Sequence, residues 1–157
     1  MIDLAEFKKE YTMTKDRKQK DEKLKELYKE LKNEITQMDI KKLEPKIYAS
    51  ENSLAHKIAF FTLEKELKMA QLRKFFSGVK NIEKKAKILS KAEEIKINEF
   101  YLLTPELAYA VGRKVAPVEF YELIKEILKK VNINQDFLNA AKFIEIIVAY
   151  ARYEEKR

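Results

Sequence analysis

The chain has 157 residues, which suits one domain, and 46% of them are hydrophobic, which excludes a disordered composition. It contains no cysteine, so disulfides and thiolate metal sites are excluded and a reducing, cytoplasmic compartment is the simpler expectation. No apolar run approaches the ~20 residues of a membrane span, so we expect no membrane partner. The net charge is +7, and it is distributed unevenly along the chain.

The N-terminal region is rich in charge. Residues 8–23 are almost wholly polar and show no apolar period, so we expect residues 1–20 to be a mobile or loosely packed segment of a single helical domain, 1–157. The following apolar residues have helical spacing and predict an amphipathic helix that ends before Pro45. They are Leu24, Leu27, Leu31 and Ile35.

The middle of the chain has the strongest helical pattern. Ser50 is a candidate N-cap, and the apolar spacing after it predicts a helix over residues 51–80, with a kink near Thr62 as an option. Further apolar residues predict a second helix, which is either separate or continuous with the first through Gly78. They are Ile82, Ala86, Leu89 and Ile95.

The last third of the chain predicts three more helices. The Thr104–Pro105 pair is typical of an N-cap followed by proline at the first helical position, and Gly112 offers a stop. Pro117 opens the next helix, and Asn134 or Asp136 caps the last one, which carries a complete apolar stripe. No segment alternates as a strand does, so we expect an all-α compact bundle of about five or six helices.

Enzyme chemistry leaves no trace in the sequence. His56 is the only histidine and is more typical of a surface or hydrogen-bonded helix residue than of a catalytic base. Gly78 and Gly112 are the only glycines, so no glycine-rich phosphate loop exists. We therefore expect no catalytic activity, no metal and no cofactor.

The whole excess of positive charge lies between Lys65 and Lys91. This segment holds nine of the 33 cations and two of the 26 acids, which leaves 24 charges of each sign elsewhere. A localised basic stretch fits a polyanionic partner, and the alternative is an ordinary solvated helix face.

Within this segment, cationic side chains follow one line of an ideal helix. Arg73, Lys80 and Lys84 fall within about 80° of one another, whereas Leu72, Phe75, Phe76 and Val79 project about 100° away, as core residues do. The guanidinium of Arg73 suits phosphate, and the lysines act as point charges. A second basic pair, Arg113–Lys114, follows Gly112 and either binds a partner or satisfies the helix dipole.

Three segments together resemble a known family. "QLRKFFSGVKNIE" at 71–83, "LAYAVGRK" at 107–114 and "FIEIIVAYARY" at 143–153 are similar, in order, to segments of the small helical subunit of the Csm effector complex of type III-A CRISPR systems. The resemblance covers about residues 50–153. It departs at Ala151, where a histidine or another basic residue is expected.

The resemblance implies a non-catalytic subunit whose copies stack and line the groove that receives target RNA paired to guide RNA. It implies target RNA, guide RNA, other Csm subunits and further copies of the chain as partners. The candidate RNA contacts are Gln71, Arg73, Lys74 and Arg113 by matching motif, Lys80 and Lys84 by the helical line, and Lys114 as the neighbour of Arg113. Tyr109 and Tyr150 are expected to pack inside the bundle.

Two other interpretations stay open. The first is a purely structural helical adaptor, in which the lysines are only solvated and apolar residues bind protein neighbours. The second is a helix-turn-helix DNA regulator, which requires a compact turn before a recognition helix that the basic segment does not show.

Overall fold

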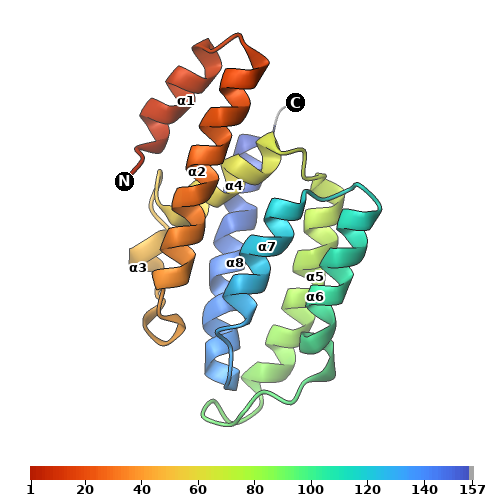
Figure 1. Cartoon of the computed structure of the whole chain (residues 1–157). Helices are drawn as coiled ribbons and strands as arrows, with labels where there is room; N and C mark the ends of the chain where they lie inside the picture. The colour runs from red at the N-terminus through yellow and green to blue at the C-terminus, as the bar shows by residue number, and fades with distance from the viewer. Residues whose placement is uncertain (156–157) are drawn as a thin grey trace.

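Apolar residues at helical spacing organise residues 1–155, the part that this computed structural model describes, into α-helices joined by short loops (Figure 1). The all-α fold class expected from the sequence is confirmed. The described helices are α1 (Leu4–Met13), α2 (Arg17–Gln37), the 3-10 helix η1 (Ile40–Lys42), α3 (Pro45–Tyr48), α4 (Leu54–Glu64), α5 (Met69–Lys87), α6 (Asn98–Gly112), α7 (Val118–Leu128) and α8 (Asn134–Glu154).

Helix α8 forms the centre of the bundle. It packs against α4, α5, α7, α3 and η1, while α2 packs against α4 and α7, and α6 packs against α5 and α7. In Figure 1, α1 and α2 lie on one side of α8, and the α5–α6 pair lies on the opposite side. Residues 156–157 of the expected domain lie outside the described residues, and the single-domain assignment stays a prediction.

The N-terminal residues differ from the expectation of a loosely packed segment. They form α1 and the start of α2, because Leu4, Phe7 and Tyr11 lie on one face of α1 and are buried. Asp3 and Asp16 cap the two helices through their side-chain oxygens. The pattern was missed because two of the three buried residues precede the polar stretch that starts at residue 8.

The helix expected over residues 51–80 is two helices. α4 begins after Ser53 rather than Ser50, and the chain turns between Glu64 and Met69 because Glu66 adopts a left-handed conformation with φ 69°. The prediction of a single helix is therefore wrong. The turn brings the backbone N–H of Lys68 to 3.2 Å from the carbonyl oxygen of Val115, which joins the start of α5 to the loop after α6.

Helix α5 is continuous through Gly78 to Lys87, which settles the alternative left open by the sequence. A Cβ at residue 78 would lie 3.6 Å from Cδ2 of Leu103, an ordinary van der Waals contact. Gly78 therefore neither breaks the helix nor is required for its packing against α6.

Helix α6 begins at Asn98, seven residues before Pro105, so the expected start at Thr104 is wrong. Phe100, Leu103 and Leu107 define its buried face. Pro105 lies on the exposed side, where water can bond the carbonyl group that its missing N–H leaves free. The helix ends at Gly112 as expected, although the left-handed residue is Lys114, with φ 63°.

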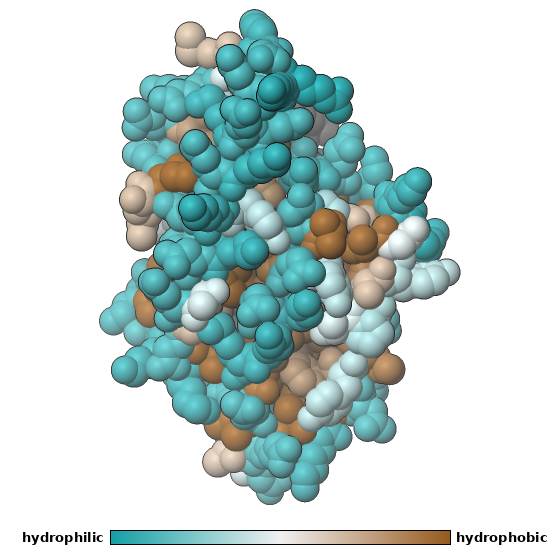
Figure 2. Space-filling view, in the orientation of Figure 1, coloured by the Kyte–Doolittle hydropathy of each residue, from teal (hydrophilic) through white to brown (hydrophobic). Residues whose placement is uncertain are grey.

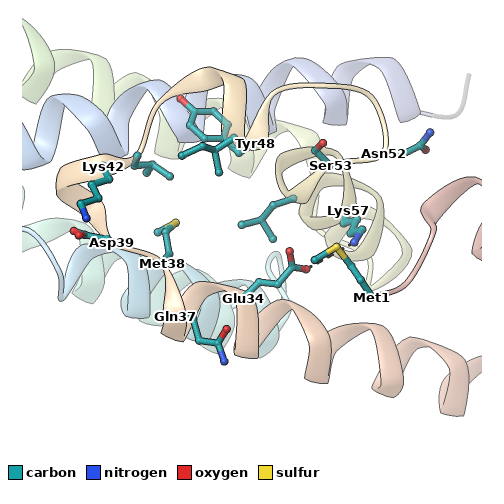
Figure 3. A pocket seen from close by; sticks show the side chains of 13 residues that line it. Met1, Glu34, Gln37, Met38, Asp39, Lys42, Tyr48, Asn52, Ser53 and Lys57 are labelled. Carbon is teal, nitrogen blue, oxygen red and sulfur yellow. Dashed lines mark ion pairs between the residues drawn. The ribbon is translucent and has the colours of Figure 1, made fainter.

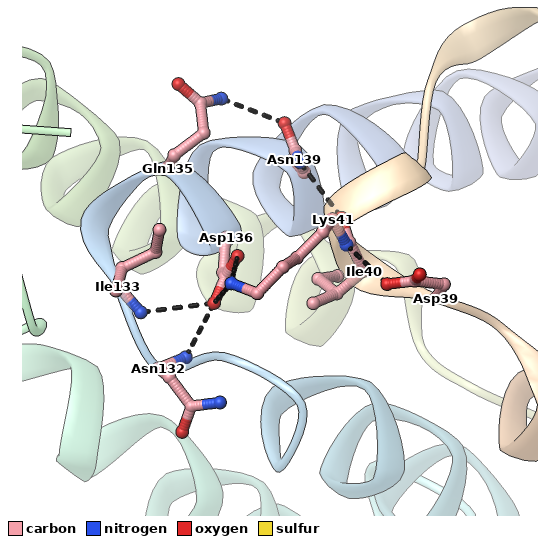
Figure 4. A network of polar contacts seen from close by, with 8 residues as sticks. All are labelled: Asp39, Ile40, Lys41, Asn132, Ile133, Gln135, Asp136 and Asn139. Carbon is pink, nitrogen blue, oxygen red and sulfur yellow. Dashed lines mark hydrogen bonds and ion pairs between the residues drawn. The ribbon is translucent and has the colours of Figure 1, made fainter. Parts of the chain in front are cut away.

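At the start of α8 the N-cap residue is Ile133, so the expectation that Asn134 or Asp136 takes this position is wrong. The capping carboxylate nevertheless comes from Asp136, the third residue of the helix. Its Oδ2 accepts the backbone N–H groups of Asn132 at 3.0 Å and Ile133 at 3.1 Å, and its Oδ1 lies 3.0 Å from Nζ of Lys41 in η1 (Figure 4). Burial raises the pKa of Asp136, but the backbone hydrogen bonds and Lys41 outweigh this and lower it. One carboxylate thus caps α8 and attaches η1 to it.

None of the helices in residues 1–155 combines the length and the apolarity that crossing a membrane requires.

Candidate nucleic-acid interface

Helix α5 has one buried side and one basic side. Leu72, Phe75 and Val79 are buried, whereas Arg73 and Lys74 are exposed. The interpretation of Phe75 as a core residue is confirmed, and Phe76 is half-buried beneath the ammonium of Lys80, 5.7 Å from the ring centroid. The buried side therefore seats α5 against the bundle and leaves its cations facing water.

A groove of about 270 Å³ lies between α5 and α6 and brings three of the predicted contact residues together. Gln71 and Lys74 line it from α5, and Arg113 lines it from just beyond the end of α6. The two helices run in opposite directions (Figure 1). The backbone N–H of Lys68, before α5, bonds the carbonyl of Val115, after α6, and Lys85 near the end of α5 forms an ion pair with Glu99 near the start of α6. This antiparallel packing places residues 71 and 113 beside the same hollow.

Most of the predicted cations have no carboxylate partner. In the described residues 1–155, no ion pair involves Arg73, Lys74 or Arg113, and the same holds for Lys84 and Lys114; all five are exposed. Arg113 instead lies over Tyr109, with its guanidinium carbon 5.8 Å from the ring centroid. Their charges therefore remain available to an anion from solution.

Lys80 is the exception among the predicted contacts. Its Nζ lies 3.0 Å from Oε1 of Glu83, whose side chain is only 8% exposed, and the hydrogen bond and charge of Glu83 raise the pKa of Lys80. Lys87 also approaches Glu83, at 4.0 Å. The charge count of the Lys65–Lys91 segment missed this neutralisation, because it subtracted Glu83 from the total without treating it as a partner one turn from Lys80.

The predicted contacts occupy two places along the surface. Gln71, Lys74 and Arg113 meet at the groove, whereas Lys84 is about 15 Å further along α5, at 1.5 Å per residue. Arg73 is next to Lys74 but about 100° around the helix, outside the lining of the groove. The structure thus brings together part of the predicted set and separates the rest.

Tyr109 is the residue that the sequence interpretation placed wrongly. It is 68% exposed and lines the groove with Leu102 and Pro105, instead of packing inside the bundle. Because Leu107 is buried, a residue two positions later lies about 160° away on a helix, and this rule could have found its exposure. Tyr150 does pack against the core, although it is only half-buried, and its hydroxyl donates to the carbonyl of Ala49 at 2.6 Å.

The surface of α6 around the groove also exposes apolar side chains. Figure 2 shows hydrophilic side chains over α1 and α2, and a paler, partly hydrophobic band over α6. Tyr101, Leu102 and Tyr109 are the large exposed residues of this helix. The surface beside the cations is therefore not uniformly polar.

His56 is a structural residue. It is buried, its Nδ1 accepts the backbone N–H of Asn52 at 3.0 Å, and its Nε2 lies 2.7 Å from Oε2 of Glu154. Both ring nitrogens are therefore occupied, which confirms the interpretation of a hydrogen-bonded residue. Across residues 1–155, no group of three or more histidine, aspartate or glutamate side chains is placed to hold a metal ion.

A larger cavity, of about 520 Å³, lies between the end of α2, α3 and the start of α4. Figure 3 shows Glu34 and Lys57 at one end of it, and Asp39 and Lys42 at the other. Lys57 is only 3% exposed, and its Nζ lies 3.1 Å from Glu30 and 3.8 Å from Glu34. The side chains that line this cavity include two lysines and two carboxylates, whereas those of the α5–α6 groove include two cations and one carboxylate.

Comparison with known proteins identifies one match. The family model described as Csm2 Type III-A matches residues 46–157, which include α5, α6 and all seven predicted contacts. The matched range leaves out α1 and α2. No curated protein and no solved structure matches the chain.

Proposed function

The chain belongs to the Csm2 type III-A family, the small subunit of a type III-A Csm complex, and we propose that it is non-catalytic and holds RNA by the phosphate backbone. The RNA in question is the target strand and its duplex with the guide. One observation supports this most: Lys74 and Arg113, which form no ion pair in residues 1–155, meet beside Gln71 in one groove. A cationic groove of this kind attracts a polyanion.

The chemistry of these side chains suits phosphate rather than base edges. Arg113 offers a planar fork of N–H donors, Lys74 offers a point charge, and the amide of Gln71 can donate to a phosphate or sugar oxygen. Contacts of this type fix the position of a nucleic acid without reading its sequence. A subunit that accepts any target needs that independence from sequence.

The remaining predicted cations extend this surface unequally. Arg73, Lys84 and Lys114 are exposed and supply charge near the groove or along α5. Lys80 contributes less in this proposal, because Glu83 already neutralises it. Single-copy affinity is then modest and sensitive to salt, and stacked copies gain by multivalency.

The test measures binding of the full chain to single-stranded RNAs of unrelated sequence across a salt series. Lys74→Glu with Arg113→Glu is expected to weaken binding to all of them, and to reduce the slope of log affinity against log salt by about 0.7 for each lost phosphate contact. The matched control is Lys25→Glu with Lys29→Glu, two exposed residues of α2 outside the family match. Wild-type binding by the groove variant, or binding of only one sequence, contradicts the proposal.

A structural adaptor without RNA contact is the second candidate function. The exposed apolar residues of α6 favour it, because such surfaces mark contacts with other proteins. Membership of the complex implies other Csm subunits as neighbours, and further copies of the chain are part of the proposal. If the groove variant assembles normally and the assembled complex binds target RNA with wild-type affinity, the adaptor function replaces the RNA-binding one.

A further inference from the structure

We infer that Tyr109, backed by Arg113, is a stacking platform for an unpaired RNA base, so that the α5–α6 groove holds a whole nucleotide rather than a phosphate alone. This inference rests on the proposed function and extends it. The inference starts from the exposure of Tyr109. Its relative accessibility is 68%, although the opposite face of α6 is buried in the core.

Tyr109 differs from the other exposed tyrosines of residues 1–155, whose side chains contact other parts of the fold. Tyr101 donates its hydroxyl to the carbonyl of Ile95 at 2.9 Å, and the ring of Tyr153 contacts His56 edge-on. Within residues 1–155, the hydroxyl of Tyr109 forms no hydrogen bond and its ring contacts no other aromatic ring. The guanidinium of Arg113, one helical turn away, lies over the ring of Tyr109.

The groove combines the two chemistries of a nucleotide. Phe75, Leu107 and Ala110 are buried residues that supply an apolar floor, and Leu102 and Pro105 are its exposed apolar lining. Lys74 and Arg113 supply two cations against one acid, Glu106, so the lining keeps a positive charge. A flat apolar base and its anionic phosphate match this arrangement of apolar and cationic groups.

The size of the groove limits the ligand to a small one. Its volume of about 270 Å³ lies below the range of about 300–1,000 Å³ that drug-sized ligands occupy, which suits a single base. A base inside a duplex is stacked on both faces, so only an unpaired or displaced base can present its face to Tyr109. Stacking is compatible with any sequence because every base has a π-face.

The experiment separates stacking from phosphate binding. The full chain is titrated with a single-stranded oligonucleotide that carries a fluorescent adenine analogue, and with an abasic oligonucleotide of equal length and charge. Wild type and Tyr109→Phe are expected to quench the analogue and to bind the base-bearing strand about five- to 150-fold tighter, as stacking of about 1–3 kcal/mol per base gives. Tyr109→Leu is expected to lose the quenching and the preference while keeping the salt slope of wild type.

Each outcome decides between the proposals. If Tyr109→Leu still quenches and prefers bases, the platform is wrong, while a normal salt slope continues to support phosphate binding. If no variant binds either strand in a salt-dependent way, the proposed function fails and the platform fails with it. If Tyr109→Leu binds RNA as wild type does but no longer enters the complex, the exposed face of α6 is a protein contact and the platform is overturned. Circular dichroism of each variant verifies folding.

Discussion

Nε2 of His56 lies 2.7 Å from Oε2 of Glu154, and the same carboxylate lies 2.7 Å from Nζ of Lys8. Because Nδ1 of His56 accepts the N–H of Asn52, its Nε2 carries the hydrogen and donates to Glu154. The ring of His56 also stacks on Tyr150, with the centroids 4.3 Å apart. One residue near the end of α8 therefore connects α4 and α1 to the central helix.

Replacing Glu154 by glutamine is expected to lower the free energy of unfolding by about 1–3 kcal/mol at neutral pH, because Lys8 then loses its charged partner. Burial raises the pKa of Glu154, but the hydrogen bonds from Lys8 and His56 outweigh it and hold the pKa below its ordinary value of 4.5. A lowered pKa in the folded state means that this stability is present above pH 4.5 and is lost as the pH falls through the folded-state pKa.

Urea unfolding of wild type and Glu154→Gln at a series of pH values measures this dependence. The difference between the two should be constant near neutral pH and shrink on acidification below about pH 4.5. Glu51→Gln, which removes an exposed carboxylate without an ion pair in the described residues, is the control. A difference that stays constant down to the lowest pH contradicts the assignment.

The buried Lys57 cluster predicts opposite effects for its two carboxylates. Burial raises the pKa of Glu34, even though Lys57 opposes this, so the ionised carboxylate is disfavoured in the fold. Glu30 lies closer to Lys57, at 3.1 Å. Glu34→Gln is expected to raise the free energy of unfolding at neutral pH by up to about 1 kcal/mol, and Glu30→Gln to lower it by about 1–3 kcal/mol.

The raised pKa of Glu34 also predicts how the stability difference between wild type and Glu34→Gln changes with pH. A raised pKa means that wild type loses stability as the pH rises from the unfolded value, 4.5, through the folded one, whereas glutamine does not titrate. The advantage of Glu34→Gln should therefore vanish in acid. Thermal unfolding at several pH values measures it, and a destabilised Glu34→Gln at pH 7 shows that the carboxylate is favourably paired instead.

Lys80 and Lys84 provide a matched pair on one helix. Both were predicted as RNA contacts, but Lys80 lies 3.0 Å from Glu83, and Lys84 forms no ion pair within the described residues. Lys84→Met is expected to reduce the salt slope of RNA binding by about 0.7, and Lys80→Met by clearly less. The two variants remove the same charge, so equal losses would show that Glu83 does not neutralise Lys80 when RNA is bound.

The sequence predicted those parts of the fold that depend on apolar spacing. The buried residues of α7 and α8 follow it over their whole length, and Pro117 precedes α7 as expected. The break between α4 and α5 at Glu66 was missed because it depends on a left-handed residue. The start expected at Thr104 was wrong because Pro105 lies on the solvent side of α6, where the helix continues through it. Such features are decided by tertiary packing rather than by local preference.

The candidate site was also predicted only in part, because part of it depends on tertiary packing. Motif and helical spacing selected the exposed cations Arg73, Lys74 and Arg113. The exposure of Tyr109 follows from the burial of Leu107 two positions earlier on the same helix, so spacing could have predicted it. The convergence of Lys74 and Arg113, in contrast, required the antiparallel packing of α5 on α6. Long-range packing of this kind cannot be read from spacing within one helix.

Gly78→Ala tests whether the glycine in the middle of α5 has a role beyond its place in the helix. The added Cβ would lie 3.6 Å from Cδ2 of Leu103, which requires no rearrangement, and α5 is helical on both sides of the residue. Alanine also restricts the unfolded chain, so we expect the free energy of unfolding to rise by about 0.5–1 kcal/mol. Chemical unfolding measures the gain, and binding to single-stranded RNA should be unchanged, because no cation moves. A loss of stability would mean that α5 and α6 pack more closely at residue 78 than this contact distance indicates, whereas a loss of RNA binding alone would mean that α5 bends at Gly78 when it holds RNA.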